Sequence, residues 1–224
     1  AGGKVYALNG AAAYLNENGI LPDFQVILDA RPDTAVLVGP AKEHLFASQC
    51  APETFAAAPD ATLWHLQVEN FEELLPENEA DEEDDAVIGG AASVGNTGIC
   101  LVYARGHRRI ECFGYDSCHK GEESHPFSQP LNNGEPCVIV NYGGKEYLAS
   151  LTMRMQAEKF QDTAKELQRL GCTINVHGYG LLPDIWNAPN VIVSERDKYR
   201  VMWDIPNYRI VSHGSELAEM FSEV

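Results

Sequence analysis

The sequence IGGAASVGNTGICLVYARGHRRIECFGYD, from Ile88 to Asp116, decides the predicted fold. Gly89–Gly90 can adopt turn conformations that are closed to other residues. A helix is predicted over Ala92–Ala104, because apolar side chains recur there at helical spacing and Gly106 follows as a stop. The apolar strand Arg109–Gly114 comes next. A turn, a helix and a buried strand in this order are typical of an α/β protein.

Both ends of this stretch are predicted to bind a ligand. Backbone N–H groups at the helix entrance can bind an anion. Open α/β sheets bind ligands outside the carboxyl ends of their strands, so the residues after the strand should face the same crevice as the glycine turn. The candidates are Gly89, Gly90, Ser93, Gly95 and Asn96 at the helix entrance, and Gly114, Tyr115 and Asp116 after the strand. A tight turn with a capped helix would explain the first group without any ligand.

The rest of the chain alternates strands with helices. Strands are predicted at Lys4–Leu8, Phe24–Leu28, His44–Ser48, Thr62–Val68 and Cys172–Val176, helices at Ala11–Asn18, Pro52–Ala58 and Leu151–Leu170, and an antiparallel hairpin at Pro136–Ala149. We therefore expect a Rossmann-like α/β three-layer sandwich, with a mainly parallel sheet and helices on both faces, plus a β-hairpin and a C-terminal tail. The domain should span residues 1–189, and residues 190–224 should form tail helices and loops or a linker.

Two further places offer ligand or catalytic groups. Asp29 stands at the carboxyl end of the second predicted strand, although it could instead cap a turn with Arg31. The polar loop 117–134 carries His119 and His125, which suit a general acid or base. Zinc binding by these histidines with Cys118 and Asp116 is disfavoured, because their spacing matches no common zinc site.

Composition excludes several classes of protein. The formal charge is −17, but ten of the 33 acidic residues lie in Glu69–Asp85, which leaves 23 against 16 basic residues elsewhere. This acidic segment should be a surface loop. No basic face for nucleic acid is expected. The six cysteines form no CxxC pair, as in a reducing cytoplasm, and no run is apolar enough for a membrane helix.

The order NGAAAYLNENGILPDFQVILDARPD, then IGGAASVGNTGICLVYARGHRRIECFGYD, then a loop with HPF resembles the 6-hydroxymethylpterin diphosphokinase MptE-like family. Many members of this family are uncharacterised bacterial and phage proteins. The resemblance covers about Val5 to Trp186 and implies magnesium-dependent transfer of diphosphate from ATP to a pterin alcohol. The fold of the family also resembles bacterial sialyltransferases that use CMP-sialic acid. That likeness implies that Asn9, Gly10, Ser93 and Gly95 contact a nucleotide.

One departure from the family concerns the start of the chain. Members usually open with a strand and a GPSL-type glycine loop before the NGA unit, whereas this sequence begins at Ala1 without them. We expect that the loop has been lost or truncated, or that another chain supplies it. The neighbouring strand, Lys4–Leu8, would then keep an unpaired edge, which favours a homodimer through this edge or through the aromatic tail.

The sequence as a whole predicts a cytoplasmic, nucleotide-binding transferase that uses Mg²⁺ and ATP and has a small-molecule acceptor. Asp29 and Asp116 are expected to bind the metal, Gly89–Asn96 to cradle phosphate, and His125, or alternatively His119, to activate the acceptor hydroxyl. Two alternatives remain. The chain could be a CMP-sugar-dependent glycosyltransferase, or a non-catalytic nucleotide-binding or phage assembly domain.

Overall fold

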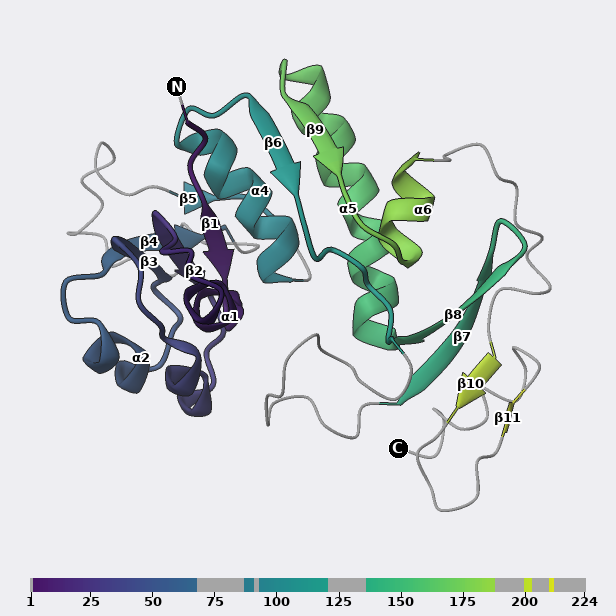
Figure 1. Cartoon of the computed structure of the whole chain (residues 1–224), viewed down its shortest axis with the longest axis horizontal. Helices are drawn as coiled ribbons and strands as arrows, with labels where there is room; N and C mark the ends of the chain where they lie inside the picture. Colours follow the sequence, from purple (N-terminus) through teal and green to yellow (C-terminus); the bar gives the residue numbers. More distant parts are fainter. Residues whose placement is uncertain are drawn as a thin grey trace. The chain divides into compact units, whose positions relative to one another are not determined.

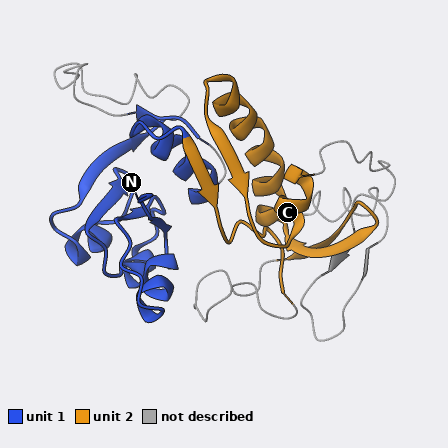
Figure 2. Cartoon of the chain, turned by 45° about the horizontal axis from the view of Figure 1, so that its top comes forward, with its two compact units in different colours: residues 1–108 blue, residues 109–224 orange. Residues whose placement is uncertain are grey.

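A computed structural model of the chain describes residues 2–67, 87–90, 93–120 and 136–187, and the backbone of two short strands at 200–202 and 210–211. The chain forms two compact units, residues 1–108 and 109–224, each with its own core (Figure 2). The sequence predicted one domain over 1–189. The acidic segment 69–85, His125 and most of the tail lie outside the described residues.

Unit 1, residues 1–108, is built on a parallel sheet of five strands in the order β1-β2-β3-β4-β5 (Figure 1). The strands are β1 (Tyr6–Leu8), β2 (Phe24–Ile27), β3 (Glu43–Ala47), β4 (Thr62–Leu66) and β5 (Val87–Ile88), and the helices are α1 (Ala11–Glu17), η1 (Pro32–Leu37), α2 (Pro52–Ala57) and α4 (Val94–Ala104). Helix α4 contacts β1, β2 and β5, so one helix reaches both edge strands because the sheet is curled. The predicted α/β, Rossmann-like fold is confirmed.

The sheet follows chain order without the reversal found in a doubly wound sheet. Strand β2 is buried along its whole length, as expected for an inner parallel strand. Its one polar side chain, Gln25, is 0% exposed. The Gln25 amide donates to the carbonyls of Asn9 (2.9 Å) and Leu37 (2.7 Å) and accepts from the N–H of Gly39 (3.0 Å). Gln25 thus links three connecting segments to the sheet.

A buried carboxylate closes the start of β2. Asp23 accepts hydrogen bonds from the Val5 N–H (3.0 Å), the Lys42 ammonium (2.9 Å) and the Lys4 ammonium (3.1 Å). These donors, the Val5 N–H foremost, hold the pKa of the Asp23 carboxyl well below its usual range. Because the folded pKa lies below the unfolded one, the stabilisation is fully present above about pH 4 and is lost as the pH falls further.

We therefore expect Asp23→Asn to lower the melting temperature at pH 7, since the amide keeps an acceptor but loses the charge. The difference from wild type should shrink as the pH falls below about 4, where the native carboxylate begins to lose its advantage. Thermal unfolding between pH 7 and pH 2.5 measures this, and Asp60→Asn, in an exposed turn, serves as the control. A difference that stays constant with pH would contradict the assignment.

Unit 2, residues 109–224, contains two further sheets. Strands β6 (Arg109–Cys112) and β9 (Thr173–Val176) form a parallel pair. Strands β7 (Cys137–Tyr142) and β8 (Lys145–Ser150) form the predicted hairpin, which β10 (Arg200–Met202) and β11 (Ile210–Val211) extend to four strands. Helices α5 (Leu151–Arg169) and α6 (Leu181–Asn187) both contact β9.

Most predicted elements are confirmed to within two residues at their ends. The hairpin turns at Gly143 and Gly144, whose φ angles of 60° and 77° are those of a type I′ turn. Differences lie elsewhere: β5 was not predicted, α6 replaces a predicted closing turn, and the tail holds two short strands where helices and loops were expected. These elements are short, and tertiary contacts rather than local periodicity define them.

Two general properties of the chain follow from the structure. No helix in the described ranges has the length and apolar composition that crossing a bilayer requires. All six cysteines are reduced thiols. Burial raises the pKa of the Cys50 and Cys100 thiols to about 11 and that of Cys112 to about 12. These three side chains therefore act as small apolar groups.

Candidate functional site

The carboxyl ends of the strands of unit 1 meet at one edge of the sheet. Because all five strands are parallel, the segments that follow β1, β2 and β5 emerge at this edge. They are Asn9–Gly10, Asp29 and Gly89–Gly90. Helix α4 begins at the same edge, because a Cβ placed on Gly98 would lie 3.1 Å from the side chain of Leu8, at the end of β1 (Figure 1). The structure thus brings the candidates of unit 1 to one edge.

Asn9 has the least ordinary backbone of this edge. Its φ angle is 46°, in the left-handed region that few residues other than glycine adopt. The conformation is held by the bond from the Asn9 N–H to the Val26 carbonyl (3.0 Å) and by the bond from Gln25 to the Asn9 carbonyl. The side-chain Oδ1 is buried and accepts no hydrogen bond from the described residues. A buried acceptor without a partner is rare, and only a donor such as a hydroxyl or amino group can pair with it.

The glycine turn after β5 is required by packing. Gly90 has φ 148°, and a Cβ there would lie 2.7 Å from Thr97 Cα and 2.8 Å from Thr97 Oγ1. The turn therefore lies directly against the first two turns of α4, where a side chain has no room. This packing explains Gly90 without a ligand, whereas Gly89 would only approach the amide oxygen of Gln67 at 3.2 Å.

The entrance of α4 is a capped helix, as predicted. Ser93 is extended, with φ −162°, and its hydroxyl accepts from the Asn96 N–H at 3.2 Å. Gly95 and Asn96 are buried in the first turn. The aligned peptide dipoles place partial positive charge at this end of the helix, which favours an anion.

Asp29 forms an ion pair with the side chain of Arg31. Its carboxylate accepts from the Arg31 N–H (3.0 Å) and forms an ion pair with the Arg31 guanidinium (2.6 Å). Burial raises the pKa of the Asp29 carboxyl, but the hydrogen bonds from Arg31 outweigh burial and hold this pKa below its usual value. The turn with Arg31 is therefore present, and a metal role for Asp29 requires a ligand to compete with the guanidinium.

The candidates after β6 belong to unit 2. Asp116 pairs with Lys120 at 2.9 Å, and its carbonyl accepts from the Leu182 N–H at 3.2 Å. Gly114 is exposed with φ 72°, which suits a turn. The Tyr115 ring packs edge-on against Phe160, with centroids 5.7 Å apart. That these residues share a crevice with the glycine turn stays a prediction.

The loop histidines are only partly described. His119 follows Asp116 closely, and its Nε2 lies 3.5 Å from the Sγ of Cys137, while its N–H donates to the Leu148 carbonyl at 2.7 Å. His125 lies outside the described residues. Within the described ranges, no group of three His, Cys, Asp or Glu side chains could hold a metal ion. Asp29 and Asp116 lie in different units, and magnesium binding by either stays a prediction.

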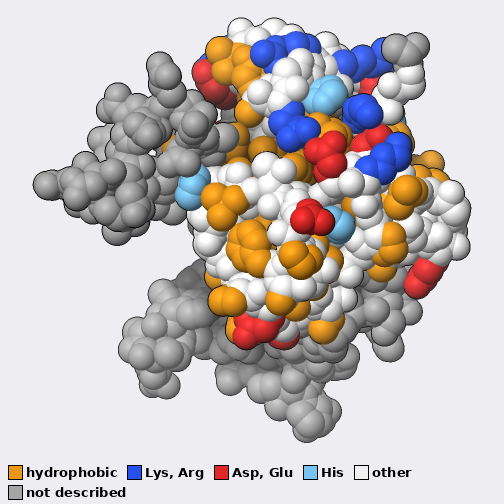
Figure 3. Space-filling view, turned by 90° about the vertical axis from the view of Figure 1, so that its left-hand side faces the viewer, with side chains coloured by type: hydrophobic (Ala, Val, Ile, Leu, Met, Phe, Trp, Pro, Cys, Tyr) orange, Lys and Arg blue, Asp and Glu red, His pale blue; other side chains and the backbone are white. Residues whose placement is uncertain are grey.

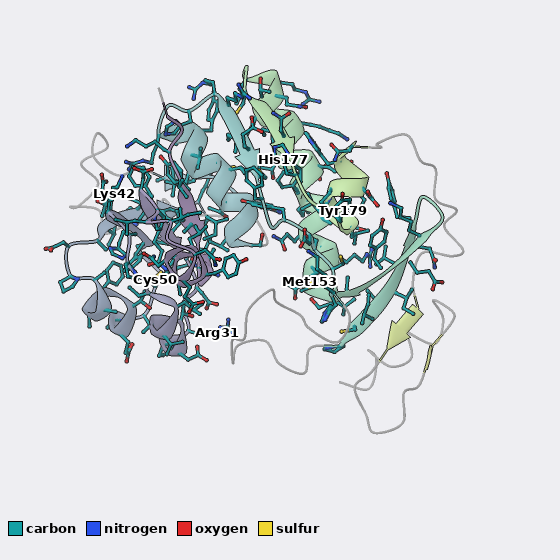
Figure 4. All side chains as sticks on the ribbon, viewed as in Figure 1. Arg31, Lys42, Cys50, Met153, His177 and Tyr179 are labelled. Carbon is teal, nitrogen blue, oxygen red and sulfur yellow. The ribbon has the colours of Figure 1, made fainter. Side chains whose placement is uncertain are left out.

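Sequence reasoning missed one polar pair, Glu111 with His177. Figure 4 labels His177. Glu111 Oε2 lies 2.7 Å from His177 Nε2, which joins the end of β9 to the middle of β6. The available signal was a carboxylate between the apolar residues Ile110 and Cys112, in a strand that also carries Arg109, and this alternation is ordinary for a strand with one polar face. The partner, 66 residues further along the chain, could not be found in this way.

The charged surface of unit 1 is mixed in sign. On the face in Figure 3, Lys and Arg side chains lie beside Asp and Glu side chains. Ion pairs of this unit include Lys4 with Asp23 (3.1 Å) and Arg105 with Glu43 (3.8 Å). Such pairs neutralise basic side chains locally and are worth little stability when exposed.

Comparisons of the chain with family models, with curated proteins and with solved structures found no match. The residues themselves must therefore indicate the function. In unit 1 these are the constrained Asn9, the Asn9–Gly10 turn and the entrance of α4. In unit 2 they are the segment after β6 and the Glu111–His177 pair.

Proposed function

We propose that this chain is a nucleotide-binding transferase that moves a diphosphate or phosphoryl group from ATP to a small hydroxylated acceptor. The resemblance to 6-hydroxymethylpterin diphosphokinases suggests this reaction. The observation that carries the proposal is the buried Oδ1 of Asn9, which accepts no hydrogen bond from the described residues, at the carboxyl edge of a parallel sheet.

The chemistry of this edge suits the two ends of a nucleotide. An amide oxygen takes a hydrogen bond only from a donor, so Asn9 fits a ribose hydroxyl or a base amino group. We place phosphate at the entrance of α4, Ser93–Asn96, because the helix dipole favours negative charge there, and phosphate would compete with the Ser93 hydroxyl for the Asn96 N–H. Phosphoryl transfer depends mainly on such positioning and charge neutralisation.

The proposal includes Mg²⁺ as a partner of the phosphates. Magnesium usually keeps several waters and binds through one or two carboxylates together with substrate phosphates, so a cluster of three protein ligands is not required. Asp29 would serve as such a carboxylate if the phosphates drew Arg31 away from it, because both groups are anions that suit the guanidinium. The homodimer, the acceptor and the base that activates it stay predictions.

Calorimetry with ATP, GTP, CTP and CMP, each with and without Mg²⁺, tests the proposal. Triphosphate binding that needs the metal supports diphosphokinase chemistry. Metal-independent binding of CMP would overturn that chemistry in favour of glycosyl transfer from a CMP-sugar. No binding of any nucleotide would overturn the proposal and leave the assembly domain.

A variant at the helix entrance makes the test specific. Gly95→Val is expected to abolish ATP binding, because Gly95 is buried in the first turn of α4 and a branched side chain there blocks close approach of phosphate to the backbone. Gly106→Val is the control, since it makes the same change just past the other end of α4, where nothing lies within 4 Å. Its φ of 92° adds backbone strain, so this variant should lose stability but keep its affinity for ATP.

Ser93→Ala supports this test should Gly95→Val fail to fold. It removes the hydroxyl that caps α4, which costs about 1 kcal/mol of stability, and leaves the fold intact. We expect weaker ATP binding from this variant, because the first turn of the helix is then less well held. Unchanged affinity in both variants would refute the phosphate cradle.

A further inference from the structure

The parallel pair β6–β9 has one packed face and one open face. Residues alternate between the faces, so Ile110, Cys112, Ile174 and Val176 share the buried one. The other face carries Arg109, Glu111 and Phe113 from β6 and the residue after it, and Asn175 and His177 from β9 and the residue after it. Parallel sheets are usually covered on both faces. Within unit 2 this face is nevertheless polar, and Phe113 is 71% exposed.

Both oxygens of the Glu111 carboxylate on this face have hydrogen-bond partners. Glu111 Oε1 accepts from Arg109 Nε (2.8 Å) and from Asn175 Nδ2 (3.1 Å), while Oε2 lies 2.7 Å from His177 Nε2. The hydrogen bonds from His177, Arg109 and Asn175, in that order, lower the pKa of the Glu111 carboxyl to about 2. An ionised carboxylate can only accept hydrogen bonds, so His177 Nε2 must carry a hydrogen.

The orientation of the His177 ring follows from these contacts. With the hydrogen on Nε2, the neutral ring has its lone pair on Nδ1. The ring of Phe113 stacks on the imidazole, with centroids 4.6 Å apart and planes 12° apart. The backbone is also fixed, because the His177 N–H donates to the Cys112 carbonyl at 2.9 Å. Carboxylate, aromatic ring and backbone therefore hold the imidazole in one orientation.

The lone pair on Nδ1 is available to a ligand. No contact with Nδ1 of His177 is found among the described residues, and the side chain is 45% exposed. It lies at the carboxyl end of β9, the end at which parallel strands bind ligands. Tyr179 follows two residues later and is 86% exposed (Figure 4). The ring of Phe113 stacks on the imidazole, and Tyr179 adds a second exposed aromatic side chain two positions along the chain, so this strand end offers aromatic surface to a planar, hydrogen-bonding molecule.

We propose that His177, positioned by Glu111 and Phe113, is a proton-accepting group of unit 2 that takes a hydrogen bond from the hydroxyl or ring N–H of a planar small molecule. Proton transfer moves the hydrogen from the ligand to Nδ1, which gives an imidazolium beside the Glu111 carboxylate and leaves the electron pair on the ligand. The carboxylate favours this change because it stabilises the imidazolium that forms.

Modification by diethyl pyrocarbonate tests whether Nδ1 of His177 is an available proton acceptor, and it requires no knowledge of the protein's activity. Nδ1 attacks the reagent's carbonyl carbon, one anhydride C–O bond breaks, ethyl carbonate leaves as the anion, and the hydrogen on Nε2 is lost to water to give the neutral N-carbethoxy ring. Mass mapping of the full chain at pH 7 should show His177 modified faster than His107, because His177 is exposed, whereas His107 is partly buried and its Nε2 is bonded to the Tyr6 hydroxyl at 3.0 Å. Glu111→Gln should slow the modification of His177 about threefold and leave His107 unchanged, because an amide, which both donates and accepts, no longer fixes the hydrogen on Nε2 and the lone pair on Nδ1.

Two results would overturn the assignment of His177 as a proton acceptor positioned by Glu111. One is that His177 reacts no faster than His107, and the other is that Glu111→Gln has no effect on the rate at His177 while the protein remains folded by circular dichroism. Should Glu111→Gln not fold, Asn175→Ala removes one hydrogen bond to the same carboxylate and should slow the reaction by a smaller factor.

Protection by a ligand tests whether His177 binds a planar small molecule. The probe is 6-hydroxymethylpterin, a planar ring with both a ring N–H and a hydroxyl, and this choice rests on the proposed function. It should protect wild-type His177 from modification, and Phe113→Ala with Tyr179→Ala should abolish protection while His177 still reacts. Absence of protection in wild type would overturn the ligand class alone. Failure of nucleotide binding would instead appear in the calorimetry, so the two failures are distinguishable.

Discussion

Gly180→Ala is expected to unfold the part of unit 2 around α6. A Cβ on Gly180 would lie 2.4 Å from the carbonyl oxygen of Asp116, 2.8 Å from its Cα and 2.9 Å from its carbonyl carbon. All three atoms belong to the backbone, so no side chain can rotate away. Gly180 also has φ 158°, at the margin of the region that L side chains rarely adopt. The substitution therefore forces the two segments apart.

The segments cannot separate at low cost. The Asp116 carbonyl accepts from the Leu182 N–H at 3.2 Å, and Leu181 and Leu182 are 0% and 1% exposed. Moving them breaks this bond and opens the core of unit 2. Overpacking a well-packed core typically costs 1–3 kcal/mol, and the broken contacts add to this, so we expect a loss of about 4 kcal/mol.

Gly171→Ala is the matched control. Gly171 follows α5 with φ 84°, and nothing lies within 4 Å of the added methyl group. Only backbone strain remains there, at about 1 kcal/mol. Urea unfolding, with hydrogen exchange of the β6 and β9 amides to locate the effect, measures both variants. Equal losses in the two variants would show that the contact with Asp116 does not restrict position 180.

Gln25→Met is expected to destabilise unit 1 by about 3 kcal/mol. Methionine matches glutamine in length but leaves three backbone groups without their partner, the carbonyls of Asn9 and Leu37 and the N–H of Gly39. Gln25 is 0% exposed, so water cannot replace these bonds in the native packing. Each unsatisfied buried group costs about 1–3 kcal/mol, and partial relaxation reduces the sum.

Gln49→Met is the control for this prediction. The chemical change is the same, but Gln49 is exposed, and among the described residues its side chain bonds only to the Leu28 carbonyl. We expect a loss below about 1 kcal/mol. Because Gln25 also holds the Asn9 loop, Gln25→Met should weaken ATP binding at temperatures where the protein is folded. Full stability, or full affinity in the folded variant, would contradict the role given to Gln25.

The sequence by itself determined most of the longer elements of this protein. Strands such as Phe24–Ile27 and helices such as Val94–Ala104 are encoded by local periodicity, by Ser93 as a cap and by glycines that stop the helices. A parallel sheet follows from their alternation, because strands joined by helices return in the same direction. The position of Asn9 and Asp29 at strand ends was therefore predictable.

Only the tertiary structure decided which of these groups are engaged. Arg31 forms an ion pair with Asp29, and the Gln25 amide donates to the Asn9 carbonyl. Glu111 bonds to His177 across the paired strands β6 and β9. The sequence also placed β6 directly after α4 in one unit, whereas β6 pairs with β9, more than 60 residues away. The physical reason is that strand pairing and buried hydrogen bonds join residues that are distant in the chain. A local sequence pattern does not show which distant residue will be the partner.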